Sequence, residues 1–168
     1  PMAVQQLNAW REAFPQTCFV NMYGSTEMGL AAYYEVKGAL ADAEPLPIGR
    51  PSKNMELLLL DDSGQPAASG QVGELYAKGT IASGYYQDEE RTAGAFVQNP
   101  LQDSYPETVF RTGDLARCSC HGELVYVSRK DFQVKHMGYR IELGEVETGI
   151  SSIAGVTMCG CVYDKKHG

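Results

Sequence analysis

Short strand-forming runs, each closed by a glycine or a turn signal, recur through the middle of the chain and constrain its fold most strongly. Residues 54–60 form an apolar run that ends at Asp61-Asp62-Ser63-Gly64, a sequence typical of tight turns. Residues 72–78 alternate apolar and polar side chains, as expected for an antiparallel partner strand. This pattern indicates a small, curved β-barrel or β-sandwich.

Helical patterns lie on both sides of these strands, so we expect a mixed α+β fold. Apolar residues recur at helical spacing between residues 4 and 14, and Pro15 ends that helix. Asp88 is placed to cap a short helix that runs to Phe96. Residues 142–153 predict a later helix with acidic residues at its start, where the helix dipole favours them.

The end of the chain has a pattern of its own. Residues 128–131 form a compact charged break, which is typical of a solvated linker or a hinge. Residues 132–136 and 139–142 then predict a hairpin, and residues 156–163 predict a last strand. The residues alone leave both readings of this break open.

Composition and charge argue against several classes of function. Hydrophobic residues make up 43% and charged residues 21% of the 168 residues, which are globular values. The net charge of −7 argues against nucleic acid or an anionic membrane as the main partner. No apolar run approaches the length of a membrane span and no signal segment is present, so we expect a soluble, cytoplasmic protein.

Cys118, Cys120 and His121 offer thiolate and imidazole ligands of the kind that zinc prefers. Their spacing is poor for a zinc site, and no second Cys/His pair lies at the distance typical of a zinc finger. A hairpin tip with incidental cysteines is the favoured interpretation.

The most concentrated chemistry lies directly after a β-prone run, in the heptad Asn21-Met22-Tyr23-Gly24-Ser25-Thr26-Glu27. The Tyr23 ring is suited to stacking on a flat ligand, and Gly24 permits close backbone approach. The hydroxyls of Ser25 and Thr26 are suited to phosphate oxygens, and Glu27 is suited to a hard cation. An ordinary solvated turn is the alternative.

Asp114 is a second candidate ligand-binding residue. It follows Thr112 and Gly113 at the end of a strand-like run, where its carboxylate is placed to accept hydrogen bonds from vicinal hydroxyls such as those of a ribose. The alternative is a turn aspartate that binds its own backbone.

Four sequence motifs, two of which contain the candidate residues above, follow one another in a fixed order. The first two are Asn21-x-Tyr23-Gly24-x-Thr26-Glu27 and Gly73-Glu74-Leu75 with Gly79 and Gly84-Tyr85. The third is Phe110-Arg111-Thr112-Gly113-Asp114-Leu115-Ala116. The fourth is Arg129-x-Asp131-x-Gln133-Val134-Lys135 leading to Gly138-x-Arg140-Ile141-Glu142-Leu143-Gly144-Glu145-Val146-Glu147. Together they resemble the adenylate-forming superfamily, and most of all its amino-acid-activating branch in nonribosomal peptide synthetases and D-alanine–carrier-protein ligases.

The resemblance implies a large body that ends in a distorted β-barrel, joined by a hinge to a small α+β cap. Residues 1–129 would form the C-terminal part of the body. Residues 130–168 would form the hinge and the truncated start of the cap. The family's phosphate loop would lie upstream of residue 1 and its catalytic lysine downstream of residue 168, so the fragment alone is expected to be inactive.

The reaction that the resemblance implies has two steps. An amino-acid carboxylate attacks the α-phosphate of ATP, with Mg²⁺ bound, and pyrophosphate leaves. The phosphopantetheine thiol of a partner carrier protein then takes the acyl group. The protein mainly positions these groups and neutralises developing phosphate charge.

The resemblance also implies a role for individual residues. A nucleotide-binding set would comprise Asn21, Tyr23, Gly24, Ser25, Thr26, Asp114, Tyr126 and Arg129. Tyr23 would stack on adenine with Asn21 near its polar edge, and Asp114 would bind the ribose hydroxyls. Thr26 and Glu27 would be catalytic, Thr26 at the α-phosphate and Glu27 at Mg²⁺. Tyr23, Glu27 and Asp114 are therefore expected to meet around one nucleotide.

The remaining assignments concern the sugar, the cap and the acyl substrate. Tyr126 and Arg129 would lie beside the ribose. Asp131 would be the hinge pivot, and Gly138 would line the pantetheine path. A substrate pocket would contain Met22, Leu30 and Ala31, whose apolar side chains favour a small or apolar amino acid.

Two alternatives stay open. An acyl-CoA synthetase of the same superfamily would use free coenzyme A in place of a carrier protein. A non-catalytic module could keep only a surface for carrier-protein docking, although Thr26, Glu27, Asp114 and Arg129 together favour an enzyme.

Overall fold

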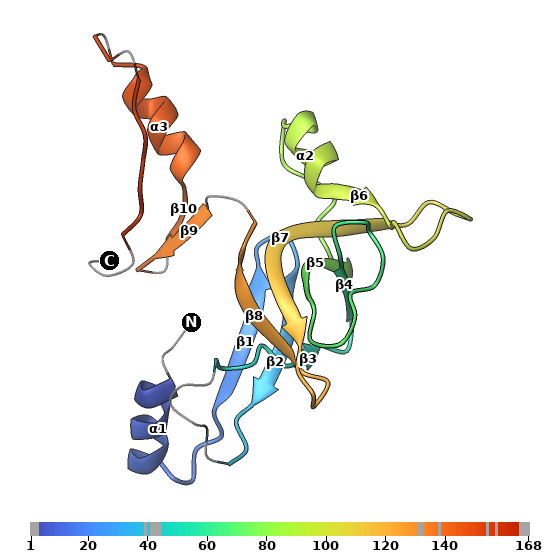
Figure 1. Cartoon of the computed structure of the whole chain (residues 1–168), viewed down its shortest axis with the longest axis vertical. Helices are drawn as coiled ribbons and strands as arrows, with labels where there is room; N and C mark the ends of the chain where they lie inside the picture. The colour runs from blue at the N-terminus through green and yellow to red at the C-terminus, as the bar shows by residue number, and fades with distance from the viewer. Residues whose placement is uncertain are drawn as a thin grey trace. The chain divides into compact units, whose positions relative to one another are not determined.

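The computed structural model describes residues 4–38, 40, 45–130, 133–137, 139–153, 155–156 and 158–164. The chain divides into two compact units, Pro1–Ser128 and Arg129–Gly168, which are described one at a time. Figure 1 shows the elements of both units. The division lies within the charged break at residues 128–131.

The first unit begins with a helix and a small sheet. Helix α1 (Val4–Ala13) ends shortly before Pro15, as predicted. Strands β1 (Val20–Ser25) and β2 (Gly29–Glu35) form an antiparallel hairpin, and the short β3 (Arg50–Pro51) pairs with β2. The heptad at residues 21–27 thus occupies the end of β1 and the turn that follows it.

A five-stranded sheet follows in the first unit. Its order is β4 (Met55–Leu60), β5 (Val72–Gly79), β7 (Thr108–Cys118) and β6 (Phe96–Gln98), and β8 (Leu124–Arg129) also pairs with β7. Figure 1 shows how strongly β7 curves along its length, so that the sheet curls into part of a barrel. The curved, antiparallel sheet agrees with the sequence prediction.

Local signals account for two of the connections. The Asp61 carboxylate accepts hydrogen bonds from the Ser63 hydroxyl (2.6 Å) and from the amides of Ser63 and Gln65, which closes the turn after β4. Helix α2 (Glu89–Ala95) begins after Asp88, whose side chain accepts from the amide of Arg91. The predicted cap is therefore confirmed.

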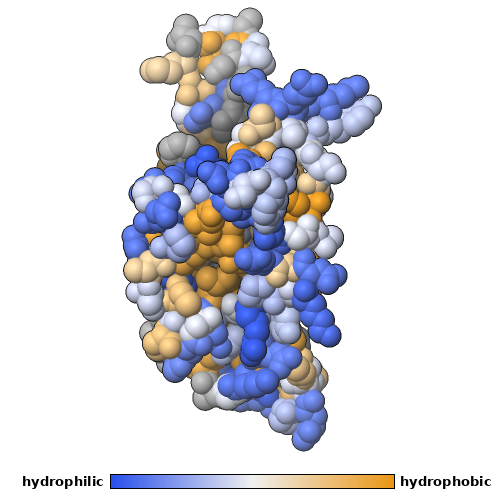
Figure 2. Space-filling model, turned by 90° about the vertical axis from the view of Figure 1, so that its right-hand side faces the viewer, coloured by the Kyte–Doolittle hydropathy of each residue, from blue (hydrophilic) through white to orange (hydrophobic). Residues whose placement is uncertain are grey.

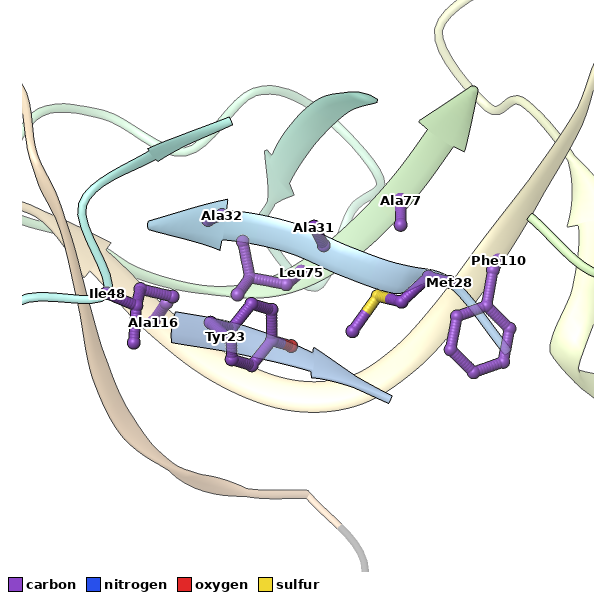
Figure 3. Close-up of a cluster of buried hydrophobic side chains, with 9 residues drawn as sticks. All are labelled: Tyr23, Met28, Ala31, Ala32, Ile48, Leu75, Ala77, Phe110 and Ala116. Atoms are coloured by element: carbon purple, nitrogen blue, oxygen red, sulfur yellow. The ribbon is translucent and has the colours of Figure 1, made fainter. Parts of the chain in front are cut away.

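The core of the first unit lies between the β1–β2 hairpin and the β5–β7 part of the larger sheet (Figure 3). Its buried members are Tyr23, Met28, Ala31, Ala32, Ile48, Leu75, Ala77, Phe110 and Ala116. Four of them are alanines, and their small side chains allow the two sheets to approach closely. Each fully buried large side chain, such as Leu75, contributes about 1.5–3 kcal/mol through removal of apolar surface from water.

The second unit contains a hairpin and a helix. Strands β9 (Gln133–His136) and β10 (Tyr139–Glu142) pair antiparallel, and helix α3 (Leu143–Ser151) follows directly. Both elements were predicted.

The predicted last strand at residues 156–163 is wrong, because the described residues of this segment form no strand. The segment bonds to helix α3 in place of a neighbouring strand. The Cys161 amide donates to Oε1 of Glu147 (2.8 Å), and the Cys159 thiol donates to the Glu147 carbonyl. The Glu147 side chain thus accepts a backbone hydrogen bond that the alternating pattern had assigned to a neighbouring strand.

Within the described residues, no helix combines the length and the apolar character needed to cross a bilayer.

Candidate functional site

The β1–β2 hairpin contains a bulge beside the heptad. Tyr23 pairs with Ala32 but Gly24 pairs with Leu30, so Ala31 is an extra residue on β2. A Cβ atom on Gly24 would collide with the carbonyl group of Gly29. Gly24 therefore permits the β2 backbone to approach closely, and its part in binding a nucleotide stays a prediction. Bulges of this kind re-aim the side chains next to them.

A second bulge carries Asp114. Glu74 of β5 pairs with Leu115 and Tyr76 pairs with Arg111, so the single residue Leu75 faces residues 112–114 of β7. Gly113 has a φ of 72°, which favours glycine.

The bulge on β7 is held by the Thr112 side chain. Its hydroxyl donates to the Leu75 carbonyl (2.8 Å) and accepts from the Asp114 amide (3.0 Å). Thr112 therefore replaces the missing ladder bonds and fixes the backbone from which the Asp114 carboxylate projects.

Tyr23 and Asp114 meet directly. The Tyr23 hydroxyl donates a 2.6 Å hydrogen bond to Oδ2 of Asp114, 91 residues away in the sequence. The exposed fractions of the two residues are 9% and 7%. A hydrogen bond to a charged acceptor in such a place contributes about 1.5–3 kcal/mol. The Tyr23 ring belongs to the core, and its stacking on adenine stays a prediction.

Glu74 and Arg111 form an ion pair next to this bulge. Nε and Nη2 of Arg111 donate to the two carboxylate oxygens of Glu74 at 2.8 and 3.2 Å. Glu74 is buried, and its hydrogen bond raises the pKa of Arg111 above the ordinary value. The pair joins the second and third sequence motifs, although sequence reasoning assigned neither residue a role.

The turn after β1 is tied to the loop at residues 81–86. The Ala82 amide donates to the Glu27 carbonyl (2.7 Å), and the Tyr85 hydroxyl donates to Oε1 of Glu27 (2.8 Å). Glu27 is 6% exposed. Sequence reasoning placed Tyr85 in a motif but missed this contact, because no local signal links residues that lie 58 positions apart.

A pocket of about 480 Å³ lies at this turn. Its lining comprises Thr26, Glu27, Met28, Gly29, Leu30, Ser52, Lys53, Asn54, Met55, Thr80, Ile81 and Ala82. The two residues predicted to be catalytic, Thr26 and Glu27, thus share one pocket, whereas Tyr23 and Asp114 are not among its lining residues.

Figure 2 shows one face of the molecule, on which apolar side chains gather in the middle and hydrophilic ones surround them.

The predicted substrate residues do not come together. Leu30 lines the pocket, Ala31 is fully buried in the core and Met22 is exposed on β1. Leu30 is 47% exposed whereas the neighbouring Ala31 is fully buried, so the two side chains have different surroundings. Their role in an acyl pocket stays a prediction.

The other predicted nucleotide residues have structural contacts of their own. The Asn21 side chain donates to the Pro47 carbonyl (2.6 Å), and Tyr126 packs against the core. The Ser25 hydroxyl oxygen is buried without a hydrogen-bond partner among the described residues. These positions do not test the nucleotide contacts that the resemblance implies.

Three predicted residues belong to the end of the chain. Arg129 is the last residue of β8 and the first of the second unit. Asp131 and Gly138 lie outside the described residues.

The site fits Mg²⁺ only as an ion shared with a ligand. The described part of the chain contains no group of three or more His, Cys, Asp and Glu side chains that could hold a metal ion. Mg²⁺ often binds through one or two carboxylates together with substrate phosphates, and needs no protein cage. Glu27, a carboxylate at the wall of a pocket, suits that arrangement.

The chain is similar in sequence to known proteins. Residues 1–86 match the family described as AMP-binding enzyme. Malpinin synthetase from Mortierella alpina is 44% identical over 138 residues, which are 82% of this chain and 2% of that protein.

Solved structures show the same relationship. The structure of IdnL1 has a TM-score of 0.89 and 37% identity, covering 96% of this chain and 34% of that one. PA1221, described as an NRPS protein containing adenylation and PCP domains, has a TM-score of 0.85 and 31% identity, covering 98% of this chain and 34% of that one. The chain thus spans about a third of these structures.

The comparisons confirm the expected fold, a mixed α and β fragment of the adenylate-forming type with a curled sheet. The family match extends over just more than half of the residues. This chain belongs to the AMP-binding enzyme family.

Proposed function

We propose that the chain is part of an ATP-dependent ligase that activates an amino acid as its adenylate and passes the acyl group to a carrier-protein thiol. The observation that carries this proposal is the Tyr23–Asp114 hydrogen bond, which joins two motifs 91 residues apart at the two bulges. A buried aspartate aimed by a strand bulge is suited to fixing a sugar. One relative is named a probable non-canonical nonribosomal peptide synthetase, and PA1221 is described as an NRPS protein containing adenylation and PCP domains.

Each side of the candidate site has its own part in the first step. The Asp114 carboxylate accepts hydrogen bonds from the ribose hydroxyls and so orients the nucleotide. The exposed Thr26 hydroxyl donates to the α-phosphate, and the Glu27 carboxylate holds Mg²⁺. When bound, Mg²⁺ supplies positive charge that neutralises phosphate oxygens during the attack.

The two steps release two products. The amino-acid carboxylate bonds to the α-phosphorus as the bond to pyrophosphate breaks. The pantetheine thiolate then bonds to the acyl carbon, and AMP leaves. The side chains assigned to the acyl substrate, Met22, Leu30 and Ala31, are all apolar and favour a small or apolar amino acid.

We assign residues 1–129 to the C-terminal part of the large body and residues 130–168 to the hinge and the start of the cap. Asp131 would be the pivot, Gly138 would line the pantetheine path, and Tyr126 and Arg129 would lie beside the sugar. The 168-residue chain alone would be inactive, because it spans only about a third of the solved structures that it matches. The use of ATP favours a cytoplasmic location.

The test is amino-acid-dependent exchange of labelled pyrophosphate into ATP by the intact ligase that contains this chain. We expect exchange with one or a few amino acids, and its loss in Asp114→Ala. No exchange with any standard or D-amino acid would contradict the proposal. Thioester formation with free coenzyme A, and none with a carrier protein, would instead indicate an acyl-CoA synthetase.

A further inference from the structure

Tyr85 donates the hydrogen bond that orients the Glu27 carboxylate. Its hydroxyl lies 2.8 Å from Oε1 of Glu27, which is buried next to the pocket. A carboxylate with one oxygen held by a donor has a restricted rotation, so its other oxygen is presented in a defined direction. Groups that hold metal ligands in this way typically change metal affinity by about 10- to 100-fold when they are removed.

The donor is itself held in place without help from Glu27. The Tyr85 amide donates to the Thr92 hydroxyl oxygen (2.8 Å), and the Thr92 hydroxyl donates to the Asp88 carbonyl (2.6 Å). Asp88 also caps helix α2. The backbone of Tyr85 is therefore anchored to the first turn of that helix.

The Tyr85 ring has its own contacts. The Arg91 guanidinium carbon lies 4.6 Å from the ring centroid, and the Phe96 ring meets the Tyr85 ring edge-on at 5.7 Å. Gly84 has a φ of 148°, and a Cβ atom there would lie 2.6 Å from Cγ2 of Thr92. The glycine thus allows the loop to pack on α2, and the hydroxyl of Tyr85 is preorganised before any ligand binds.

We propose that Tyr85 is a positioning residue. Thr92 holds its backbone amide and Arg91 lies over its ring, and its hydroxyl orients the Glu27 carboxylate toward a divalent cation that is shared with a nucleotide. This inference rests on the proposed function, which gives Glu27 its cation.

A purely structural role for Tyr85 is the competing explanation, in which the hydroxyl only satisfies a buried carboxylate. The two explanations differ in what Tyr85→Phe changes. This variant keeps the ring contacts with Arg91 and Phe96 and removes only the donor. Tyr86→Phe is the matched control, since the neighbouring Tyr86 is 90% exposed.

The experiment measures Mn²⁺ binding to the intact ligase by electron paramagnetic resonance in the presence of α,β-methylene-ATP. We expect Tyr85→Phe to weaken Mn²⁺ binding about 10-fold, with an equal rise in the Mg²⁺ concentration for half-maximal pyrophosphate exchange. The KM for the amino acid and the melting temperature should change little, and Tyr86→Phe should match the parent. Unchanged Mn²⁺ affinity in Tyr85→Phe would overturn the proposal.

Two further variants separate this inference from the proposed function. If Glu27→Gln does not weaken Mn²⁺ binding, the metal role of Glu27 fails and the inference fails with it. If Glu27→Gln abolishes binding and Tyr85→Phe has no effect, only the inference fails. Thr92→Ser, which keeps the hydroxyl, should retain parental Mn²⁺ affinity, whereas Thr92→Val should weaken binding; equal affinities would contradict the anchoring role of Thr92.

Discussion

The two sides of the candidate site are built in different ways. The Asp114 side is made of strands: Tyr23 comes from β1, Leu75 from β5, and Thr112 and Asp114 from the β7 bulge. The Glu27 side is made of a turn, the loop at residues 81–86 and the start of helix α2, which contains no buried residue. The first side shares residues with the hydrophobic core, and the second borders a pocket.

Substitutions on the two sides should therefore affect stability and ligand binding differently. Strand pairing and core packing hold the Asp114 side, so a change there should lower the free energy of unfolding along with nucleotide affinity. Hydrogen bonds hold the loop at residues 81–86 to Glu27, and regions with few buried contacts open at little cost. A change there should alter cation binding while global stability stays nearly constant.

Gly24→Ala should have the largest effect, because the new methyl group collides with the Gly29 carbonyl and prevents closure of the hairpin. We expect the free energy of unfolding to fall by more than about 3 kcal/mol in urea denaturation. Gly94→Ala is the control, since nothing lies within 4 Å of a Cβ atom at this helical position. Equal stability of both variants would show that the hairpin does not need this close approach.

Arg111→Met should come next, because it leaves the buried Glu74 carboxylate without its charged partner. Removing one partner of a fully buried pair costs about 3–5 kcal/mol. The Arg111 side chain is 43% exposed, so we expect about 1–2 kcal/mol in the same assay. In a double-mutant cycle, Glu74→Gln combined with Arg111→Met should cost less than the sum of the single changes. Strict additivity would show that the pair is not coupled.

Tyr23→Phe and Tyr85→Phe compare the two sides directly, since each removes one hydroxyl that donates to a carboxylate. We expect Tyr23→Phe to lower the free energy of unfolding by about 1.5 kcal/mol, because no donor replaces it in the core. Tyr85→Phe should cost less than about 0.5 kcal/mol, because water in the pocket can reach Glu27. A larger loss of unfolding free energy in Tyr85→Phe than in Tyr23→Phe would contradict the proposed difference between the two sides.

The smallest effect should come from a carboxylate outside both sides. The hydrogen bond from Lys78, with a further one from Asn99, lowers the pKa of Glu107 below its ordinary value. Its contribution is therefore present above the pKa of an unfolded glutamate and is lost as pH falls through the lowered value. We expect Glu107→Gln to reduce the acid dependence of unfolding, measured from neutral pH to pH about 3. An unchanged pH profile would contradict this role.

Local sequence signals predicted much of the fold. The Asp61–Gly64 turn, the Asp88 cap and the paired strands on either side of the turn depend on short-range chemistry, which a sequence displays. The family resemblance predicts that Tyr23, Glu27 and Asp114 meet around one nucleotide, and this stays a prediction. The direct Tyr23–Asp114 hydrogen bond was not predicted, because no periodicity connects two strands that far apart.

The features that sequence reasoning missed depend on contacts between distant segments of the folded chain. The bulges at Ala31 and at residues 112–114 exist only relative to a partner strand, so the isolated strand sequence does not reveal them. The Tyr85–Glu27 contact likewise needs the folded loop. The prediction of a strand at residues 156–163 was wrong for the same reason. The alternating pattern does not reveal that the Glu147 side chain accepts the hydrogen bond from the Cys161 amide.

The most direct test of the central claim is a crystal structure of the intact ligase with Mn²⁺ and a stable aminoacyl-adenylate analogue. The ribose hydroxyls should lie within hydrogen-bond distance of the Asp114 carboxylate, and a separate crystal with ATP should place the anomalous Mn²⁺ peak at Glu27. An ordered nucleotide whose sugar lies away from Asp114, with Mn²⁺ away from Glu27, would contradict the account.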